Sequence, residues 1–409
     1  MLLLFCSEFY KGDFTMKKVI ATILSVILLV SIAITPVSAL EAANTNTSVS
    51  YISVFEDFFN LESIWNFFSR IFDLFGLGFG GDSDTEEEVI PPVDFTMEQG
   101  DIISVGAKTD STHASTIVKL PNGDLMSAWF GGSGEGDDDV RIWFSVYKDG
   151  AWSEAQVIET EDTVAHWNPV LHNYGVFTRL YYKVGVDTEN WVTKYVDTID
   201  NGKNWSTPKE LVPGDTTGGR GPVRSKILVT SKGVMIAPAS TEQGDWKAFF
   251  DISKDGGLTW TKTDYVVSDT EMIQPTLWED LDGNIHALFR TKAGKIYRSD
   301  SFDGGYTWEE AYATDLPNNN SGIDVVMTDN GWLWLAYNPI NISGIRNKLI
   351  LSVSKDNGET WEEVTVLEDS PIIFNEYSYP SLIADGNRIY MSYTFERKCI
   401  KYAFVEFTK

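Results

Sequence analysis

The sequence predicts an all-β, six-bladed β-propeller, and a motif that recurs about every 50 residues is the main reason. One full copy reads SFDGGYTW at residues 301–308, and the tryptophans that end the five copies fall at residues 152, 205, 260, 308 and 361. Repeats of this length are typical of solenoids and propellers. The 33 glycines and 14 tryptophans among 409 residues also favour a fold with many turns and a large aromatic core.

Each copy of the motif has a mechanical interpretation. Its aspartate can accept hydrogen bonds from backbone N–H groups in a turn, the glycine two residues later can take a positive φ without a steric penalty, and the tryptophan can bury a large area against a sheet. Each copy therefore predicts a tight turn fastened to a strand, with a structural and not a catalytic aspartate. These aspartates are Asp200, Asp255, Asp303 and Asp356.

The repeat resembles the Asp-box, or BNR repeat, of sialidase-type β-propellers, and the resemblance covers roughly residues 100–409. The stretches HAS at 113–115 and GID at 322–324 are similar to a divergent branch of that superfamily, the predicted neuraminidases. About 310 residues at this period give six blades, so we expect the propeller to span 95–409. Its last blade would combine strands near 398–407 with a first strand near 102–105, which would close the ring.

The region before the propeller has two parts. Residues 1–39 end in a secretory signal that starts best at Met16, with Lys17 and Lys18, an apolar run over 19–34 and VSA at 37–39. An uncleaved membrane anchor is the alternative. Within 40–94 we predict an amphipathic helix over 52–75, which would dock on the propeller, a partner or a membrane surface, and then a flexible acidic linker. The protein is expected to be secreted, free or at the cell surface.

The composition excludes several classes of function. A net charge of −27 argues against nucleic-acid binding, and it requires a local basic pocket for any anionic substrate. The two cysteines, Cys6 and Cys399, do not provide a disulfide framework once the leader is removed. With four histidines and no CxxC or HExxH motif, we predict neither a metal nor a cofactor.

The sialidase resemblance implies an exo-sialidase-like glycoside hydrolase that acts on an anionic sugar. Sialidases bind the substrate carboxylate with three arginines, and here the second and third match Arg290 and Arg346. Guanidinium groups suit this task because they bind carboxylates bidentately. The acid/base aspartate matches Asp139, and the tyrosine nucleophile matches Tyr379, or Tyr377 if the register shifts. A neutral tyrosine avoids repulsion with the bound carboxylate.

Two positions depart from the sialidase pattern. His113 stands where the first arginine should be, and Gln274 stands where a glutamate should assist the tyrosine. The alternative interpretation is a polysaccharide lyase, as in some ulvan-type propellers, in which Arg or His neutralises a uronate carboxylate and Tyr or His abstracts the α-proton. Further polar residues could line such a pocket: His166, Tyr182, Arg220, Arg224 and Lys226. A non-catalytic propeller that binds an anionic glycan is the third interpretation.

Overall fold

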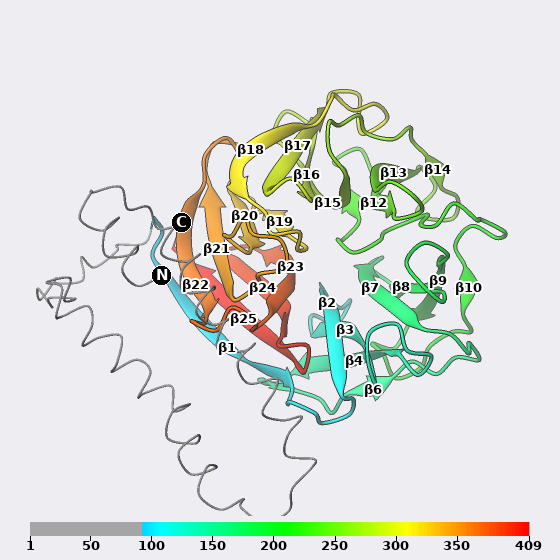
Figure 1. Ribbon diagram of the computed structural model, residues 1–409. Helices are drawn as coiled ribbons and strands as arrows, with labels where there is room; N and C mark the ends of the chain where they lie inside the picture. The colour runs from blue at the N-terminus through cyan, green and yellow to red at the C-terminus, as the bar shows by residue number, and fades with distance from the viewer. Residues whose placement is uncertain (1–91, 409) are drawn as a thin grey trace, which may run out of the picture. The chain divides into compact units, whose positions relative to one another are not determined.

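The computed structural model describes residues 92–408, and these form six antiparallel sheets arranged as the blades of a propeller (Figure 1). This confirms the predicted all-β, six-bladed fold. The predicted signal peptide, the start at Met16, the helix over 52–75 and the acidic linker lie outside the described residues. Between 92 and 408, no helix is long and apolar enough to span a membrane.

Each of the first five blades is a sheet whose strands follow one another along the chain, and the sixth also contains β1. The first two blades comprise β2 (Ser111–Lys119), β3 (Leu125–Gly132), β4 (Arg141–Lys148), β5 (Ala151–Trp152) and β6 (Gln156–Val157), then β7 (His166–Asn173), β8 (Thr178–Val184), β9 (Val192–Thr198) and β10 (Lys209–Glu210). The third and fourth comprise β11 (Leu228–Val229), β12 (Met235–Thr241), β13 (Lys247–Ser253) and β14 (Thr261–Lys262), then β15 (Met272–Glu279), β16 (Ile285–Thr291), β17 (Lys295–Ser301) and β18 (Tyr312–Pro317). The last two comprise β19 (Asp324–Met327), β20 (Leu333–Tyr337), β21 (Lys348–Ser354) and β22 (Glu362–Asp369), then β23 (Tyr377–Asp385), β24 (Arg388–Phe395), β25 (Cys399–Phe407) and β1 (Phe95–Ile103).

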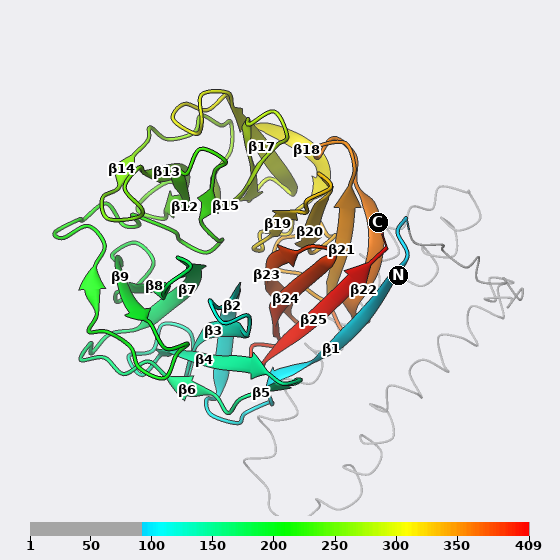
Figure 2. The ribbon, with the colours of Figure 1, turned by 180° about the vertical axis from the view of Figure 1, so that it is seen from behind.

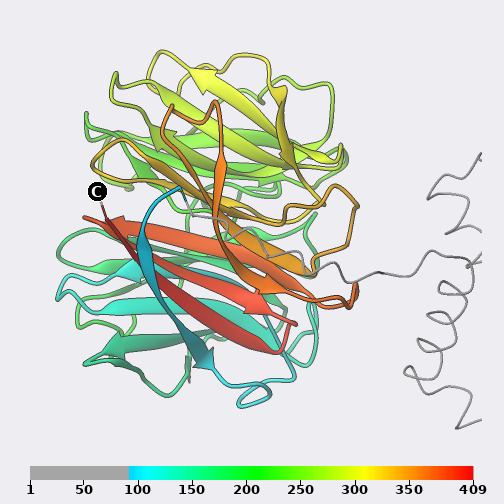
Figure 3. The ribbon, with the colours of Figure 1, turned by 90° about the vertical axis from the view of Figure 1, so that its left-hand side faces the viewer.

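The ring is closed by strands from both ends of the described chain. Strand β1 pairs antiparallel with β25 in the sixth blade, from Phe95 opposite Phe407 to Ile103 opposite Ile400 (Figures 2 and 3). The closing strand therefore begins earlier than the predicted 102–105. Pairing the two ends in one sheet gives the first strand a partner along its whole length and so ties the last blade to the first.

The Asp-box turns form as predicted. The Asp303 carboxylate accepts hydrogen bonds from the backbone N–H of Thr307 (3.0 Å) and from its hydroxyl (2.7 Å), while the Trp308 indole donates to the Gly305 carbonyl (3.0 Å). The turns at Asp255 and Asp356 repeat these bonds, and the turn at Asp200 uses Asn204 in place of the threonine. With both carboxylate oxygens occupied in this way, the aspartates serve the fold.

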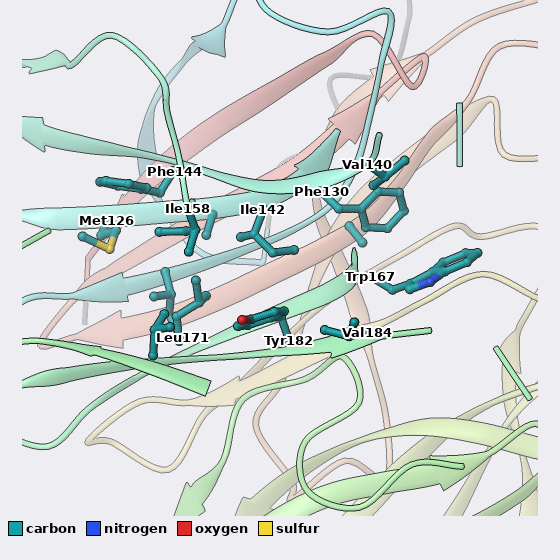
Figure 4. Packing of buried hydrophobic residues seen from close by; sticks show 14 of the residues in the cluster. Met126, Phe130, Val140, Ile142, Phe144, Ile158, Trp167, Leu171, Tyr182 and Val184 are labelled. Carbon is teal, nitrogen blue, oxygen red and sulfur yellow. The ribbon is translucent and has the colours of Figure 1, made fainter. Parts of the chain in front are cut away.

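Large side chains fill the spaces between neighbouring blades. Between the first and second blades, Phe130 and Trp167 meet edge to face with ring centroids 6.2 Å apart, and Tyr182 lies in the same cluster (Figure 4). Because the second strand of each of these blades is covered on both faces, β3 and β8 have no exposed residue. The tight packing fixes the inner strands, and with them the residues that face the centre of the ring.

Candidate functional site

Four inner strands each contain a bulge near their start, where one residue departs from the regular strand conformation. The bulge residues have a positive φ: Ala114 in β2 (54°), Asn168 in β7 (31°), Gln274 in β15 (51°) and Tyr379 in β23 (53°). The pairing register shifts at the same four places. Such φ values are unfavourable for non-glycine residues and cluster at functional sites. The bulge therefore marks one end of the inner strands as the candidate site.

Tyr379 is the centre of this site, and three guanidinium groups surround its ring. Their central carbons lie 5.3 Å (Arg224), 5.7 Å (Arg290) and 5.6 Å (Arg346) from the ring centroid. Arg290 Nη1 also donates a hydrogen bond of 2.6 Å to the Tyr379 hydroxyl. The sequence prediction left the register between two tyrosines open, and the structure brings Tyr379 to the arginines.

Arg290 is buried without a carboxylate hydrogen-bond partner. It is 7 % exposed, and among residues 92–408 its hydrogen-bond partners are neutral: the side chains of Gln274 (2.9 Å), Asn320 (2.8 Å) and Tyr379. Two other buried arginines are paired with carboxylates, Arg179 with Asp197 at 2.7 Å and Arg298 with Asp300 at 2.9 Å, whereas the buried Arg224 donates to backbone carbonyls. An unpaired buried charge is costly. Arg290 itself has no carboxylate hydrogen-bond partner among the described residues.

A fourth arginine, which the sequence did not reveal, enters the site beside His113. Arg397 Nε and Arg346 Nη1 both donate to the Glu376 carboxylate at 2.8 Å, and Arg397 also pairs with Glu135. The Arg397 carbonyl accepts a 2.8 Å bond from the backbone N–H of Thr112, one residue before His113. Arg397 thus supplies positive charge close to the place where the sialidase pattern has its first arginine.

The turn that delivers Arg397 is itself strained. Glu396 and Arg397 have φ of 51° and 54°, a left-handed conformation for which glycine or asparagine is usual in a hairpin turn. Each such residue costs of order 1 kcal/mol or more. Bonds around Glu376 hold the turn in place, since its carbonyl accepts from the Glu396 N–H and its side chain binds Arg397. No local sequence signal for a left-handed turn was available at these residues.

His113 packs against Tyr379 as a neutral ring. The two ring centroids are 4.2 Å apart, and within residues 92–408 neither imidazole nitrogen has a hydrogen-bond partner. Burial, with Arg397 next in importance, lowers the pKa of His113 well below its ordinary value. The imidazole of His113 is therefore neutral at physiological pH.

The carboxyl groups near the site differ in protonation. Asp139 is exposed, and hydrogen bonds from the side chain and backbone of Ser133 lower its pKa, which makes it a poor proton donor in this arrangement. Burial raises the pKa of Glu242, which follows β12 and is close enough to Arg290 and Glu135 to sense their charges. Glu242, which the sequence analysis did not identify, is therefore better suited than Asp139 to donate a proton. The pKa of Glu376 is lowered instead: burial acts to raise it, but the charges of His113, when protonated, and of Arg346 and Arg397 outweigh burial.

A buried polar cluster forms the floor beneath Tyr379. Arg224 donates to the carbonyls of Ile323 (2.7 Å) and Pro380, so its head group joins the fifth and sixth blades. Lys226 binds both carboxylate oxygens of Asp324 at 2.9 Å. Arg224 was predicted to bind substrate, but these contacts place it under the tyrosine ring as a support.

The remaining predicted residues lie away from Tyr379. His166 packs against Tyr182 with ring centroids 5.0 Å apart and lies 3.4 Å from the Asp162 carboxylate. Tyr377 packs against Phe395 in the core of the last blades. Each of His166 and Tyr377 lies two residues before its bulge residue and turns into the space between blades. Arg220 is bound to Asp251 at 2.6 Å.

Fold and site together define the class, a sialidase-type β-propeller. Residues 123–391 match the BNR repeat-like domain family, and the chain belongs to that family. No curated protein matches the sequence.

Solved structures with a similar fold include two sialidases. A Dyadobacter fermentans protein of unknown function is similar with a TM-score of 0.64 and 18 % identity, over 78 % of this chain and all of that one. The Hadza microbial sialidase Hz136 has a TM-score of 0.65 at 15 % identity, over 75 % of this chain and 68 % of its own. Trypanosoma rangeli sialidase in complex with sialic acid has a TM-score of 0.60 at 16 % identity, over 77 % of this chain but only 59 % of that protein.

Proposed function

We propose that this protein is a carbohydrate-active enzyme, an exo-sialidase-like glycoside hydrolase. Its substrate would be a glycan that contains a sugar with a carboxylate group. The observation that carries the proposal is Arg290, which is buried yet bonded only to neutral side chains among the described residues. In a chain of net charge −27, such a site attracts an anion only if the local charge is arranged for it. A sugar carboxylate would supply the missing partner and receive bidentate hydrogen bonds.

Three arginines would share this carboxylate. Arg290 and Arg346 are the predicted ones, and Arg397 adds a third guanidinium that is 33 % exposed at its side chain and can be reached from solvent. Glu376 holds Arg346 and Arg397 at a fixed spacing. Such preorganisation reduces the entropy cost of binding.

Cleavage would use Tyr379 as the nucleophile at the anomeric carbon. The phenol proton needs an acceptor, and since Gln274 cannot act as a base, the neutral imidazole of His113 would take this part. Negative charge on the phenol oxygen would be stabilised by the Arg290 hydrogen bond. Glu242, whose pKa is raised by burial, would give its proton to the leaving oxygen.

The same groups support a second candidate, a uronate lyase. The specific observation is the pair of His113 and Tyr379 next to arginines, with Gln274 in place of a carboxylate base. In that reaction the arginines would neutralise the uronate, His113 or Tyr379 would remove the α-proton, and the other would protonate the leaving oxygen.

A product assay separates the candidates. The full chain is incubated with a sialoside and with uronate polysaccharides, while released sugar and the absorbance of a new C=C bond are followed. Released sialic acid supports the hydrolase, and a rising absorbance supports the lyase. Arg290→Ala should abolish either activity, whereas Lys355→Ala, which removes an exposed cation at an Asp-box turn, should not. Turnover by Arg290→Ala would refute the site. Binding without turnover would leave a glycan-binding propeller.

A further inference from the structure

A second concave surface lies at the seam where the last blade meets the first. It is lined by Glu98 of β1, Leu125 and Tyr147 of the first blade, and Arg388, Tyr390 and Phe404 of the last; we call it the seam groove. Figure 2 shows the ends of β4 and β5 next to β1 and β25 at this seam. Its volume of about 490 Å³ is in the range of small-molecule sites.

The seam groove opens at the end of the propeller away from Tyr379. Lys119 and Asp385 also line it, and they lie at the last residues of the inner strands β2 and β23. His113, near the start of β2, is six residues from Lys119, which is about 20 Å along a strand. A ligand in the seam groove would therefore not touch the arginines.

Aromatic rings form the walls of the seam groove. Tyr147 and Tyr390 both stand nearly perpendicular to Phe404, at 86° and 78°, with ring centroids 5.2 Å and 5.0 Å away. All three are half-buried, so part of each ring faces solvent. Tyr402, on the same face of β25, extends the surface and lies over Gly100, where a Cβ would come within 3.0 Å of its ring. The glycine therefore makes room for an aromatic face.

The polar groups of the seam groove suit a ligand without charge. Lys119 pairs with Asp385, and Arg388 pairs with Glu406 at 2.8 Å, so these cations are already neutralised. Five acidic and three basic residues line the groove, which repels anions. Glu98 Oε1 accepts from the Tyr402 hydroxyl at 2.8 Å, and among the described residues its second oxygen has no partner.

We propose that the seam groove binds a neutral oligosaccharide. The apolar faces of sugar rings would pack against Phe404 and the two tyrosines, and sugar hydroxyls would donate to Glu98. Aromatic rings with a polar tip combine apolar contact area with hydrogen bonding at one place. The seam groove thus holds a neutral part of a glycan, independently of the chemistry at Tyr379.

The test is a titration of the full chain with neutral tetrasaccharides, namely cellotetraose, xylotetraose and maltotetraose, followed by calorimetry and by saturation-transfer NMR. At least one should bind with a millimolar or tighter Kd. Tyr147→Ala and Tyr390→Ala should each weaken that binding at least five-fold. Tyr265→Ala, which removes a 41 % exposed tyrosine from another blade, is the matched control and should not. Circular dichroism and Tm confirm that the variants fold.

Arg290→Ala distinguishes this proposal from the proposed function. Neutral binding should persist in that variant, whereas binding of an anionic sugar should be lost. The proposal is overturned if none of the three probes binds at 10 mM, if both tyrosine variants bind as the wild type does, or if Arg290→Ala abolishes the binding. It is also overturned if light scattering at 100 µM shows a dimer that Tyr390→Ala dissolves, because the seam groove would then be a self-association surface.

Discussion

Replacing Asp324 by asparagine tests the floor beneath Tyr379. This carboxylate is fully buried and joins several blades. It binds Lys226 from the segment before the third blade at 2.9 Å, the Thr276 hydroxyl of the fourth at 2.6 Å and the Leu382 N–H of the sixth at 2.7 Å. Asparagine keeps the size of the side chain but removes its charge, so the ammonium of Lys226 loses its counter-ion.

The expected loss follows from these contacts. Removing one partner of a buried ion pair costs about 3–5 kcal/mol, because the other charge remains buried and uncompensated. Unfolding of roughly 310 residues has an entropy of about 0.65 kcal/mol/K, so Tm should fall by about 5–8 °C. Calorimetry of the full chain measures this. Asp315→Asn, at an exposed pair 3.7 Å from Lys295, is the matched control and should change stability by less than about 0.5 kcal/mol.

A double variant identifies the cause. If the unpaired charge is responsible, Lys226→Met combined with Asp324→Asn should recover part of the lost stability, since no buried charge is then left alone. The Tyr379 strand should also be affected, because Leu382 belongs to β23, and the activity should fall with the Tm. An Asp324→Asn protein that melts within 1 °C of the wild type would refute the view that this cluster ties the blades together.

Three further changes test the candidate site. Arg397→Ala should raise KM about 10- to 100-fold with a smaller effect on kcat, because one charge-assisted hydrogen bond to the substrate is worth about 1.5–3 kcal/mol. An unchanged KM would show that Arg397 does not bind the substrate. Glu242→Gln should remove the alkaline limb of the pH–rate profile, since the proton of Glu242 is lost as pH rises through its raised pKa; a profile that keeps this limb would assign the proton to another group. His113→Gln should make stability less dependent on pH below pH 6.5. In the wild type the pKa of His113 is lowered in the folded state, so the unfolded chain binds one more proton as pH drops, and stability falls by at most about 1.4 kcal/mol per pH unit. Equal slopes of Tm against pH for the variant and the wild type would contradict this.

The fold could be predicted because its signal is local and repeated. Each Asp-box contains its own turn, hydrogen bonds and tryptophan within eight residues, so the sequence alone shows it five times. Ring closure followed from the need to cover sheet edges, although β1 begins at Phe95, well before the predicted strand. Arg290, Arg346 and Tyr379 could be named as candidates because the sialidase resemblance assigns them to recognisable strands and turns.

The parts of the site that escaped prediction depend on contacts between distant residues. Arg397 is 284 residues from His113 in sequence, and its place is set by a strained turn without glycine. The bulges had a further effect: one inserted residue changes which side chains face the centre of the ring. His166 and Tyr377 look like site residues in the sequence, yet the structure turns both into the core.

The charge arrangement of the site gives a reason for the two departures from the sialidase pattern. With His113 in place of an arginine, the site keeps a neutral base against Tyr379, and Arg397 restores the positive charge from the adjacent hairpin. With Gln274 in place of a glutamate, Arg290 donates to a neutral amide oxygen and not to a carboxylate at this position. In the proposed mechanism the two changes would be complementary: one would move the base from the glutamate position to the histidine, and the other would leave the arginine without a carboxylate partner. A His113→Arg, Gln274→Glu double variant would restore the sialidase pattern, and more activity on sialosides together with less on any uronate substrate would show that the departures select the substrate.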